Sequence, residues 1–368
     1  MKISVITLHR VFNYGSVLQA YATQEVFKKA GYDVEIIDYI TEQRTNKRLF
    51  FDVSDSLKNK FFLKYCYLVA RAVSICIKKI TFGSFLNKYV NLSDRKYISV
   101  NDLIRNTPIA DIYVTGSDQV WNSVYNEGID RGFFLDFLPE NAKRVSFVSS
   151  FGKEKLDNYE VEKTKEYLEK YKTISVREDK AANIISDLGL EKPVQLIDPT
   201  LQLTKDEWIN IASKRLVKEP YLILMLLYNE DNNATEYARR IADEKGLKLV
   251  KISWEMKKPH LIDKLYTHRS PEDFLSLFAN ANFVVTNSFH GLAFSINLHR
   301  QFIVVPRNEY NSRIESLLTL TNLNQRMVNS EQDVNLCMNS IIDYDSVEKC
   351  LETERKKAKN FIKSLEKI

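Results

Sequence analysis

The sequence predicts an α/β protein with two parallel-sheet domains. Its 368 residues exceed the usual length of one domain, and each half of the chain carries a series of short apolar runs that alternate with helical segments. Such alternation is typical of βαβ units, whose strands lie parallel in one sheet. We therefore expect a Rossmann-like domain over residues 1–205, a second over 206–340 and a C-terminal helix over 341–368.

The first series begins with a strand, a loop, a helix and another strand. A β-rich run at residues 3–8 precedes the loop signal Asn13-Tyr-Gly-Ser, and a helix is expected over 17–30 because Gly31 follows it at the C-cap position. Further strands are expected at residues 34–37, 111–115, 145–149, 173–176 and 194–197, with a helix at 178–188.

The second series starts at residue 221 with a continuous apolar run to 228, as expected for a strand covered on both faces. Its other strands are expected at residues 248–253, 283–286 and 302–305, and its helices at 233–245, at 271–279 and after Gly291. A charged amphipathic helix over 345–368 follows.

A basic insertion interrupts the first series at about residues 41–100. This segment has twelve basic and four acidic residues, so it carries +8 of a chain whose net charge is +5. Within it Lys64, Arg71 and Lys78 recur every seven residues, which on a helix leaves a broad apolar face. We expect a helical insertion that packs on its own domain or lies on an anionic membrane surface. No nucleic-acid module accompanies the charge, and the charged positions argue against a membrane span.

Composition and motifs exclude several classes. The 10 glycines and 8 prolines are too few for a disordered or fibrous chain. The four cysteines form no C-x-x-C pair, so we expect reduced thiols instead of disulfides or zinc. An apolar N-terminus interrupted by His9 and Arg10 is too short for a signal peptide, which predicts a cytoplasmic protein. There is no P-loop, no G-x-G-x-x-G and no metal-binding motif.

Polar residues gather where the expected strands end. Because ligands of open α/β sheets bind beyond the carboxyl ends of the strands, these clusters predict one binding cleft between the domains. The candidates are Asn13, Gly15, Ser16, Gly116, Ser117, Asp118, Gln119, Ser149, Ser150, Arg177, Asp198, Ser288, His290 and Gly291.

Most candidates also have a structural interpretation. Gly15 and Gly116 suit tight turns, Ser16 suits a helix cap, and the two aspartates suit turns. Arg177 followed by an acidic residue is compatible with a surface ion pair. His290 differs from the other four histidines because it lies between a β-run and a helix, where imidazole can exchange a proton at neutral pH.

These motifs together resemble the polysaccharide pyruvyl transferase family. The matching stretches run in order over about residues 1–325: NYGSVLQAYA (13–22), GYDVEIID (31–38), TGSDQVWN (115–122), SSFG (149–152), SVRE (175–178), DPT (198–200), TNSFHG (286–291) and RIESLL (313–318).

The resemblance implies a GT-B-like pair of Rossmann-type domains with the active site in the cleft. It also implies transfer of the enolpyruvyl unit of phosphoenolpyruvate, as a ketal, onto a sugar of a surface polysaccharide or of its lipid- or nucleotide-linked precursor. Phosphoenolpyruvate is then the donor substrate, and no cofactor is expected. By the same resemblance His290 is the general acid/base, Arg177 binds the donor, and backbone N–H groups around Gly15 and Gly116 hold phosphate oxygens.

The sequence departs from the family pattern at one site position. Ser288 stands where many members have an arginine two residues before the histidine, and Arg313 or Lys153 is the candidate replacement. Two alternatives therefore stay open: a GT-B glycosyltransferase that uses a nucleotide sugar, and a non-catalytic sugar-phosphate binding protein.

Overall fold

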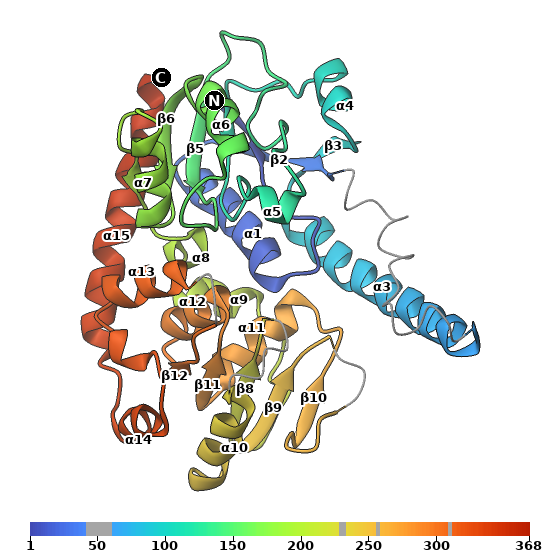
Figure 1. Cartoon of the computed structure of the whole chain (residues 1–368), viewed down its shortest axis with the longest axis vertical. Coiled ribbons are helices and arrows are strands. Elements are labelled where there is room, and N and C mark those ends of the chain that lie inside the picture. Colours follow the sequence, from blue (N-terminus) through green and yellow to red (C-terminus); the bar gives the residue numbers. More distant parts are fainter. Residues whose placement is uncertain (42–60, 228–232, 255–257, 308–310) are drawn as a thin grey trace.

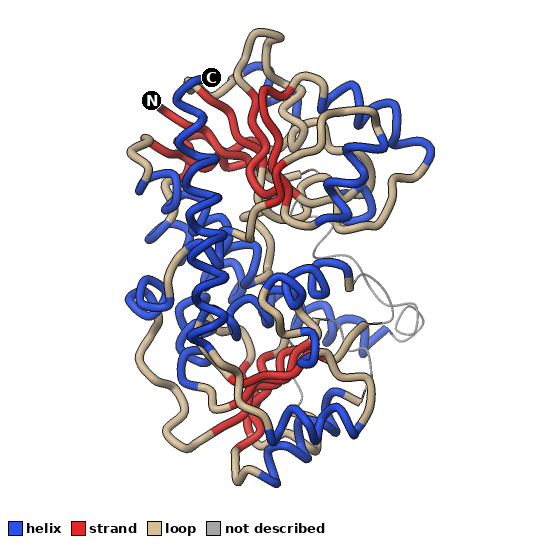
Figure 2. The backbone as a smooth tube through the Cα atoms, turned by 90° about the vertical axis from the view of Figure 1, so that its left-hand side faces the viewer, coloured by secondary structure: helices blue, strands red, loops and turns tan. Residues whose placement is uncertain are grey.

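Two parallel sheets, one of seven strands and one of five, form the centres of two α/β domains in the computed structural model of the chain (Figure 1). The structure describes residues 1–41, 61–227, 233–254, 258–307 and 311–368. Figure 2 shows the two sheets toward opposite ends of the molecule, with helices and loops between them.

The first sheet has the order β3-β2-β1-β4-β5-β6-β7, and all its pairs are parallel. Its strands are β1 (Lys2–Ile6), β2 (Asp33–Tyr39), β3 (Leu92–Tyr97), β4 (Ile112–Thr115), β5 (Arg144–Ser149), β6 (Tyr171–Val176) and β7 (Val194–Gln195). The accompanying helices are α1 (Tyr14–Lys29), α3 (Phe61–Tyr89), α4 (Val100–Arg105), α5 (Ser123–Asn126), α6 (Asn158–Leu168), α7 (Asp179–Asp187) and α8 (Pro199–Gln202).

The second sheet has the order β10-β9-β8-β11-β12, again fully parallel. Its strands are β8 (Tyr221–Met225), β9 (Lys248–Ile252), β10 (Lys264–Tyr266), β11 (Phe283–Thr286) and β12 (Gln301–Val304). The helices are α9 (Lys205–Ile211), α10 (Ala234–Glu244), α11 (Pro271–Asn280), α12 (Phe289–Asn297), α13 (Ser312–Leu320), α14 (Glu331–Asn339) and α15 (Tyr344–Ser364), with 3-10 turns at Asn324–Arg326 and Leu365–Lys367. The expected fold class is confirmed.

Two helices begin earlier than the sequence predicts, and both begin at the cleft. Helix α1 starts at Tyr14 because the Asn13 side chain accepts hydrogen bonds from the N–H groups of Gly15 and Ser16. Helix α12 starts at Phe289, with Ser288 as its N-cap, so His290 lies in its first turn. The polar residues that look like loop signals in the sequence are thus helix caps and first-turn positions.

The basic insertion is only partly helical. Helix α3 covers Phe61–Tyr89, whereas Leu92–Tyr97 form β3 at the edge of the first sheet, and residues 42–60 lie outside the described residues. Among the described helices, none combines the length with the apolar character that crossing a bilayer requires.

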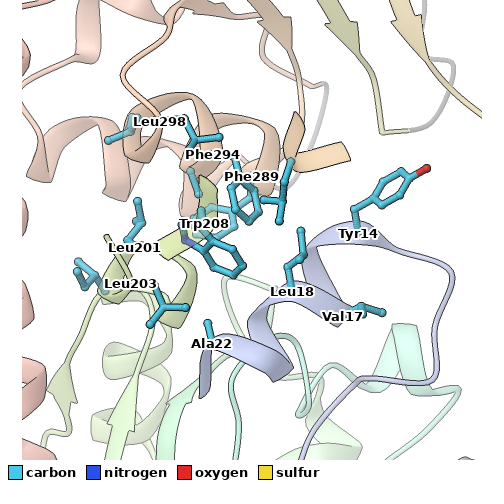
Figure 3. Close-up of a cluster of buried hydrophobic side chains, with 14 of the residues drawn as sticks. Tyr14, Val17, Leu18, Ala22, Leu201, Leu203, Trp208, Phe289, Phe294 and Leu298 are labelled. Carbon is cyan, nitrogen blue, oxygen red and sulfur yellow. The ribbon is translucent and has the colours of Figure 1, made fainter. Parts of the chain in front are cut away.

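The domains share a continuous apolar core (Figure 3). Leu18 of α1, Trp208 of α9 and Phe294 of α12 belong to this core, and all three side chains are fully buried. The indole of Trp208 donates to the carbonyl of Thr200 at 2.9 Å. This junction fixes α1 of the first domain against the second domain, next to the cleft.

Helix α15 returns the chain to the first domain (Figures 1 and 2). Arg355 donates to the carbonyl of Leu201 at 2.9 Å, and farther along the helix the ring of Phe361 lies 6.2 Å from that of Phe147 in β5. The Tyr32 hydroxyl donates to the carbonyl of Ile362 at 3.2 Å. The last helix therefore packs against the first sheet's domain and joins it to the second.

Candidate active site

A cavity of about 350 Å³ opens between the carboxyl ends of the two sheets. The first domain contributes residues that follow β1, β4 and β5, and the second contributes residues that follow β8, β11 and β12. The lining residues are Asn13, Ser16, Asp118, Gln119, Asn122, Val124, Tyr125, Glu127, Gly152, Lys153, Leu227, Asn287, Ser288, Phe289, His290, Arg307, Arg313 and Ile314. The position agrees with the rule that places ligands of such sheets at strand carboxyl ends.

At the centre of the cavity wall, the imidazole of His290 lies directly on the backbone of Gly15. A Cβ atom added to Gly15 would lie 2.0 Å from His290 Nδ1 and 2.1 Å from Cγ. Gly15 is therefore required by the close approach of the two domains, since its φ is not in the left-handed region. The contact holds the ring at a fixed position between the first turns of α1 and α12.

His290 is buried and electrically neutral at neutral pH. Burial lowers its pKa below the usual 6.5, and Arg177 and Arg313 add to this effect, while Asp198 and Asp118 oppose it. Its Nε2 is buried without a hydrogen-bond partner and lies 3.9 Å from Asp198 Oδ2. A neutral imidazole with an unused nitrogen can accept a proton from a bound molecule, and the nearby carboxylates would stabilise the imidazolium that forms.

Arg177 lies behind this wall in a network of buried carboxylates. Its guanidinium is 3.0 Å from Asp198 Oδ2, 3.4 Å from Asp118 Oδ1 and 3.4 Å from Glu178 Oε2. Burial alone would lower the pKa of Arg177, but the three carboxylates raise it above its usual value. Arg177 is thus a permanently charged, internally paired group.

The two aspartates are themselves fully engaged. Asp198 Oδ1 accepts from the N–H and the hydroxyl of Thr200, and its Oδ2 accepts from Arg177. Asp118 Oδ2 accepts from the Ser16 hydroxyl at 2.5 Å. Burial raises the pKa of Asp118, but Arg177, His290 and Ser16 outweigh that effect and lower it. The two carboxylates hold the wall together, because they connect the segments that follow β1, β4, β6 and β7.

Arg313 is the cation that this network leaves for a ligand. It is 9% exposed, lines the cavity and forms no ion pair with any residue that the structure describes. Burial and the neighbouring Arg177 lower its pKa to about 10, so it remains charged at neutral pH. Its guanidinium lies 5.9 Å from the Phe289 ring, whose centroid is also 4.7 Å from Arg177. A buried, uncompensated guanidinium at a cavity is suited to an anion.

Three groups expected to bind an anion have protein partners in this structure. Arg177 does not line the 350 Å³ cavity, because the carboxylates hold its guanidinium behind the wall. The N–H of Gly15 donates to Asn13 and that of Gly116 to the carbonyl of Ile6, so neither is available for phosphate oxygens. Lys153 lines the cavity but is paired with Glu160 at 2.6 Å and with Asp157 at 3.0 Å.

The other candidates divide into cavity and support residues. Asn13, Ser16, Asp118, Gln119, Ser288 and Arg313 line the cavity together with His290. Ser117, Ser149 and Ser150 are buried beneath it and donate to Val148, Thr115 and Glu178, respectively. Gly116 and Gly291 permit close packing, since an added Cβ would lie 2.1 Å from the carbonyl of Phe147 and 2.2 Å from Thr286 Oγ1.

Sequence reasoning missed a group of lining residues on the far side of the cavity. Val124, Tyr125 and Glu127 follow the strand-end motif after β4 but belong to α5 and its end, and Arg307 follows β12. These four residues lie in a one-turn helix, at its end and in a loop, where the sequence carries no periodic signal, so only the three-dimensional arrangement brings them together. Within the described parts of the chain, no group of three or more His, Cys, Asp or Glu side chains is arranged to hold a metal ion.

Comparison with known proteins gives a family and a fold. A sequence model of the polysaccharide pyruvyl transferase family matches residues 13–309. No curated protein matches the chain.

Solved structures that resemble this one share its two-domain architecture at low sequence identity. A putative UDP-N-acetylglucosamine 2-epimerase from Listeria monocytogenes has a TM-score of 0.53 and 12% identity, with 99% of this chain and 95% of that chain covered. The UDP-GlcNAc 2-epimerase from Methanocaldococcus jannaschii has a TM-score of 0.51 and 12% identity, with 93% of each chain covered. The glycotransferase of kitacinnamycin has a TM-score of 0.52 and 12% identity, with 100% of this chain and 98% of that chain covered. At these identities the likeness establishes the GT-B-like fold.

Proposed function

The chain belongs to the polysaccharide pyruvyl transferase family, and from this premise we propose that it is a transferase that moves pyruvate from phosphoenolpyruvate, as a ketal, onto a sugar of a surface polysaccharide or its lipid- or nucleotide-linked precursor. The observation that carries the proposal is that two groups line the same cavity: the neutral imidazole of His290, whose Nε2 has no hydrogen-bond partner, and the buried guanidinium of Arg313, which has no ion-pair partner among the described residues.

The reaction needs one proton carrier. The acid/base group takes the proton of the first sugar hydroxyl and passes it to C3 of phosphoenolpyruvate, C2 becomes oxocarbenium-like, and the hydroxyl oxygen bonds to C2. The second hydroxyl then bonds to the same carbon while the bond from C2 to the phosphate oxygen breaks, and inorganic phosphate leaves with the remaining proton. One proton leaves the first hydroxyl and one proton is added to C3, so a single acid/base group can carry out both proton transfers.

His290 is suited to that task. Its Nε2 has no competing partner, and the depressed pKa makes it a base before the donor reacts. Once protonated it lies near Asp198 and Asp118, which favour the charged form. Its place in the first turn of α12 opposes that charge, so the imidazolium releases its proton readily.

Arg313 is the proposed anchor for the anionic donor. It replaces the arginine that many family members carry at the position of Ser288, because it is the buried cation without an ion-pair partner among the described residues of the cavity. A guanidinium binds carboxylate or phosphate with two parallel hydrogen bonds, which would orient C2 and C3 of the donor toward His290. Arg177 is then a positioning residue that fixes Asp118 and Asp198.

The test is a product assay with the purified protein, phosphoenolpyruvate and a panel of UDP-sugars and lipid-linked sugars. We expect phosphate release that depends on the acceptor, and a product whose mass and NMR spectrum show a pyruvyl ketal. Transfer of a sugar with release of a nucleotide would instead support the glycosyltransferase alternative. Saturable calorimetric binding of phosphoenolpyruvate or a sugar nucleotide without any product would support the non-catalytic alternative.

We place this reaction in the cytoplasm, where phosphoenolpyruvate and nucleotide-linked sugars are formed. The free thiols of Cys76, Cys337 and Cys350 are compatible with a reducing compartment. Fractionation of cells that express the tagged protein tests this placement.

A further inference from the structure

Helix α3 presents an apolar ridge to solvent. Val69, Val73, Ile77 and Ile80 are 63%, 52%, 38% and 70% exposed, respectively. Their spacing of four, four and three residues places all four side chains on one side of the helix. We call these four residues the outer ridge of α3. Scattered exposed apolar residues are ordinary, but a continuous line of them over three helical turns is not.

The opposite face of α3 is anchored, so the outer ridge has a fixed orientation. Ile75, Phe82 and Phe85 are buried in or beside the first domain. The Ser74 hydroxyl and His268 Nε2 of the second domain are 2.6 Å apart, and Lys78 lies 4.6 Å from the Trp254 ring. Figure 1 shows α3 projecting from the side of the molecule. The ridge is therefore displayed by a helix that both domains hold in place.

The charge of α3 indicates what the ridge can contact. Its 29 residues include five basic side chains and no acidic one, so the helix is positively charged, although Lys78 faces Trp254 and Lys88 lies 4.0 Å from Glu272. Two copies of this helix packed ridge to ridge would bring two positively charged helices together, which disfavours a dimer through this face. An anionic lipid surface instead satisfies both features, because it accepts the apolar side chains between its headgroups and attracts the charge.

We propose that the outer ridge of α3 docks on the anionic surface of a lipid bilayer, as an interfacial helix that lies in the membrane plane. The ridge is too short and the helix too charged to span the bilayer, so the contact is peripheral and reversible. This inference stands independently of the proposed reaction, since it rests on α3 and not on the cavity.

Vesicle flotation of the full chain tests the proposal. We expect the protein to float with vesicles of phosphatidylglycerol and phosphatidylcholine, to remain unbound with phosphatidylcholine alone, and to dissociate at high salt. The double variant Val73→Glu, Ile80→Glu should lower binding to the anionic vesicles by roughly tenfold or more, because it removes two apolar contacts and adds two negative charges.

The matched control is Leu336→Glu, Ile341→Glu, which replaces residues of similar exposure, 64% and 87%, in and just after α14. This variant should bind the vesicles as the parent does. All variants are checked by thermal melting, and light scattering measures their mass. Equal binding to neutral vesicles, equal loss of binding in both double variants, no flotation of the parent, or a parent dimer that dissociates only in Val73→Glu, Ile80→Glu would each overturn the proposal.

Discussion

Replacement of Gly15 by alanine tests whether the contact between the domains sets the position of the proposed acid/base. The new Cβ would lie 2.0 Å from His290 Nδ1, whereas ordinary contacts of a Cβ begin at 3.4 Å, so the imidazole must retreat by about 1.4 Å. Displacement of a reacting group by about 1 Å can reduce a rate by about 100-fold. We therefore expect kcat to fall by roughly two orders of magnitude, with a smaller change in KM.

Stability should respond far less than activity to Gly15→Ala. Overpacking costs about 1–3 kcal/mol, but alanine in a helix gains about 0.5–1 kcal/mol over glycine, and the atom that must move belongs to a side chain. The measurements are acceptor-dependent phosphate release and thermal unfolding. Gly83→Ala is the matched control, because Gly83 lies within α3 and an added Cβ meets no atom within 4 Å. Near-normal kcat in a folded Gly15→Ala enzyme would refute the reasoning.

Four further predictions concern the charged groups of the site. His290→Ala should abolish turnover and leave circular dichroism unchanged; retained turnover would remove His290 from the mechanism. Arg313→Gln should weaken phosphoenolpyruvate binding by about 1.5–3 kcal/mol while acceptor binding changes little, as titration calorimetry would measure, and an unchanged donor affinity would contradict its role. Arg177→Ala should lower the free energy of unfolding by about 3–5 kcal/mol, since it leaves buried carboxylates unpaired; a melting temperature equal to the parent's would show that the network is not structural. Because burial lowers the pKa of His290 in the folded state, the unfolded chain binds more protons below pH 6.5, and stability should fall as the pH decreases through that value. His290→Gln should reduce this dependence, and an identical pH profile in denaturant titrations would exclude His290 as its source.

The fold was largely predictable because its signals are local. Runs such as residues 221–225 and 283–286 are apolar and short, and each is followed by a helix or a polar cluster, so the strands and the cleft position follow from general rules. The edge strand β3 was missed because Leu92–Tyr97 is rich in polar and charged residues that face solvent at a sheet edge. The short strand β10 gives too little sequence for a pattern.

The site was predictable in location but not in detail. The clusters after β1, β4 and β11 meet at the cavity as expected, because strand carboxyl ends share one edge. The sequence cannot show which side chains neutralise one another across chain distances of 21 and 59 residues, as Arg177 does with Asp198 and Asp118. The sequence also gives no reason to prefer Arg313 to Lys153 as the anion-binding cation. That preference comes from the ion pair between Lys153 and Glu160, which only the structure shows.

The return of α15 has a consequence for the order of events during biosynthesis. The face of the first domain that meets Phe361 and Ile362 stays uncovered until α15 has left the ribosome. By then the whole second sheet, which ends at Val304, has been synthesised and can fold. The domain that is translated first is thus the one completed last, in contrast to the usual N-to-C order of domain maturation. A ribosome that stops short of α15 would release a chain that contains both sheets but lacks the helix that covers this face of the first domain.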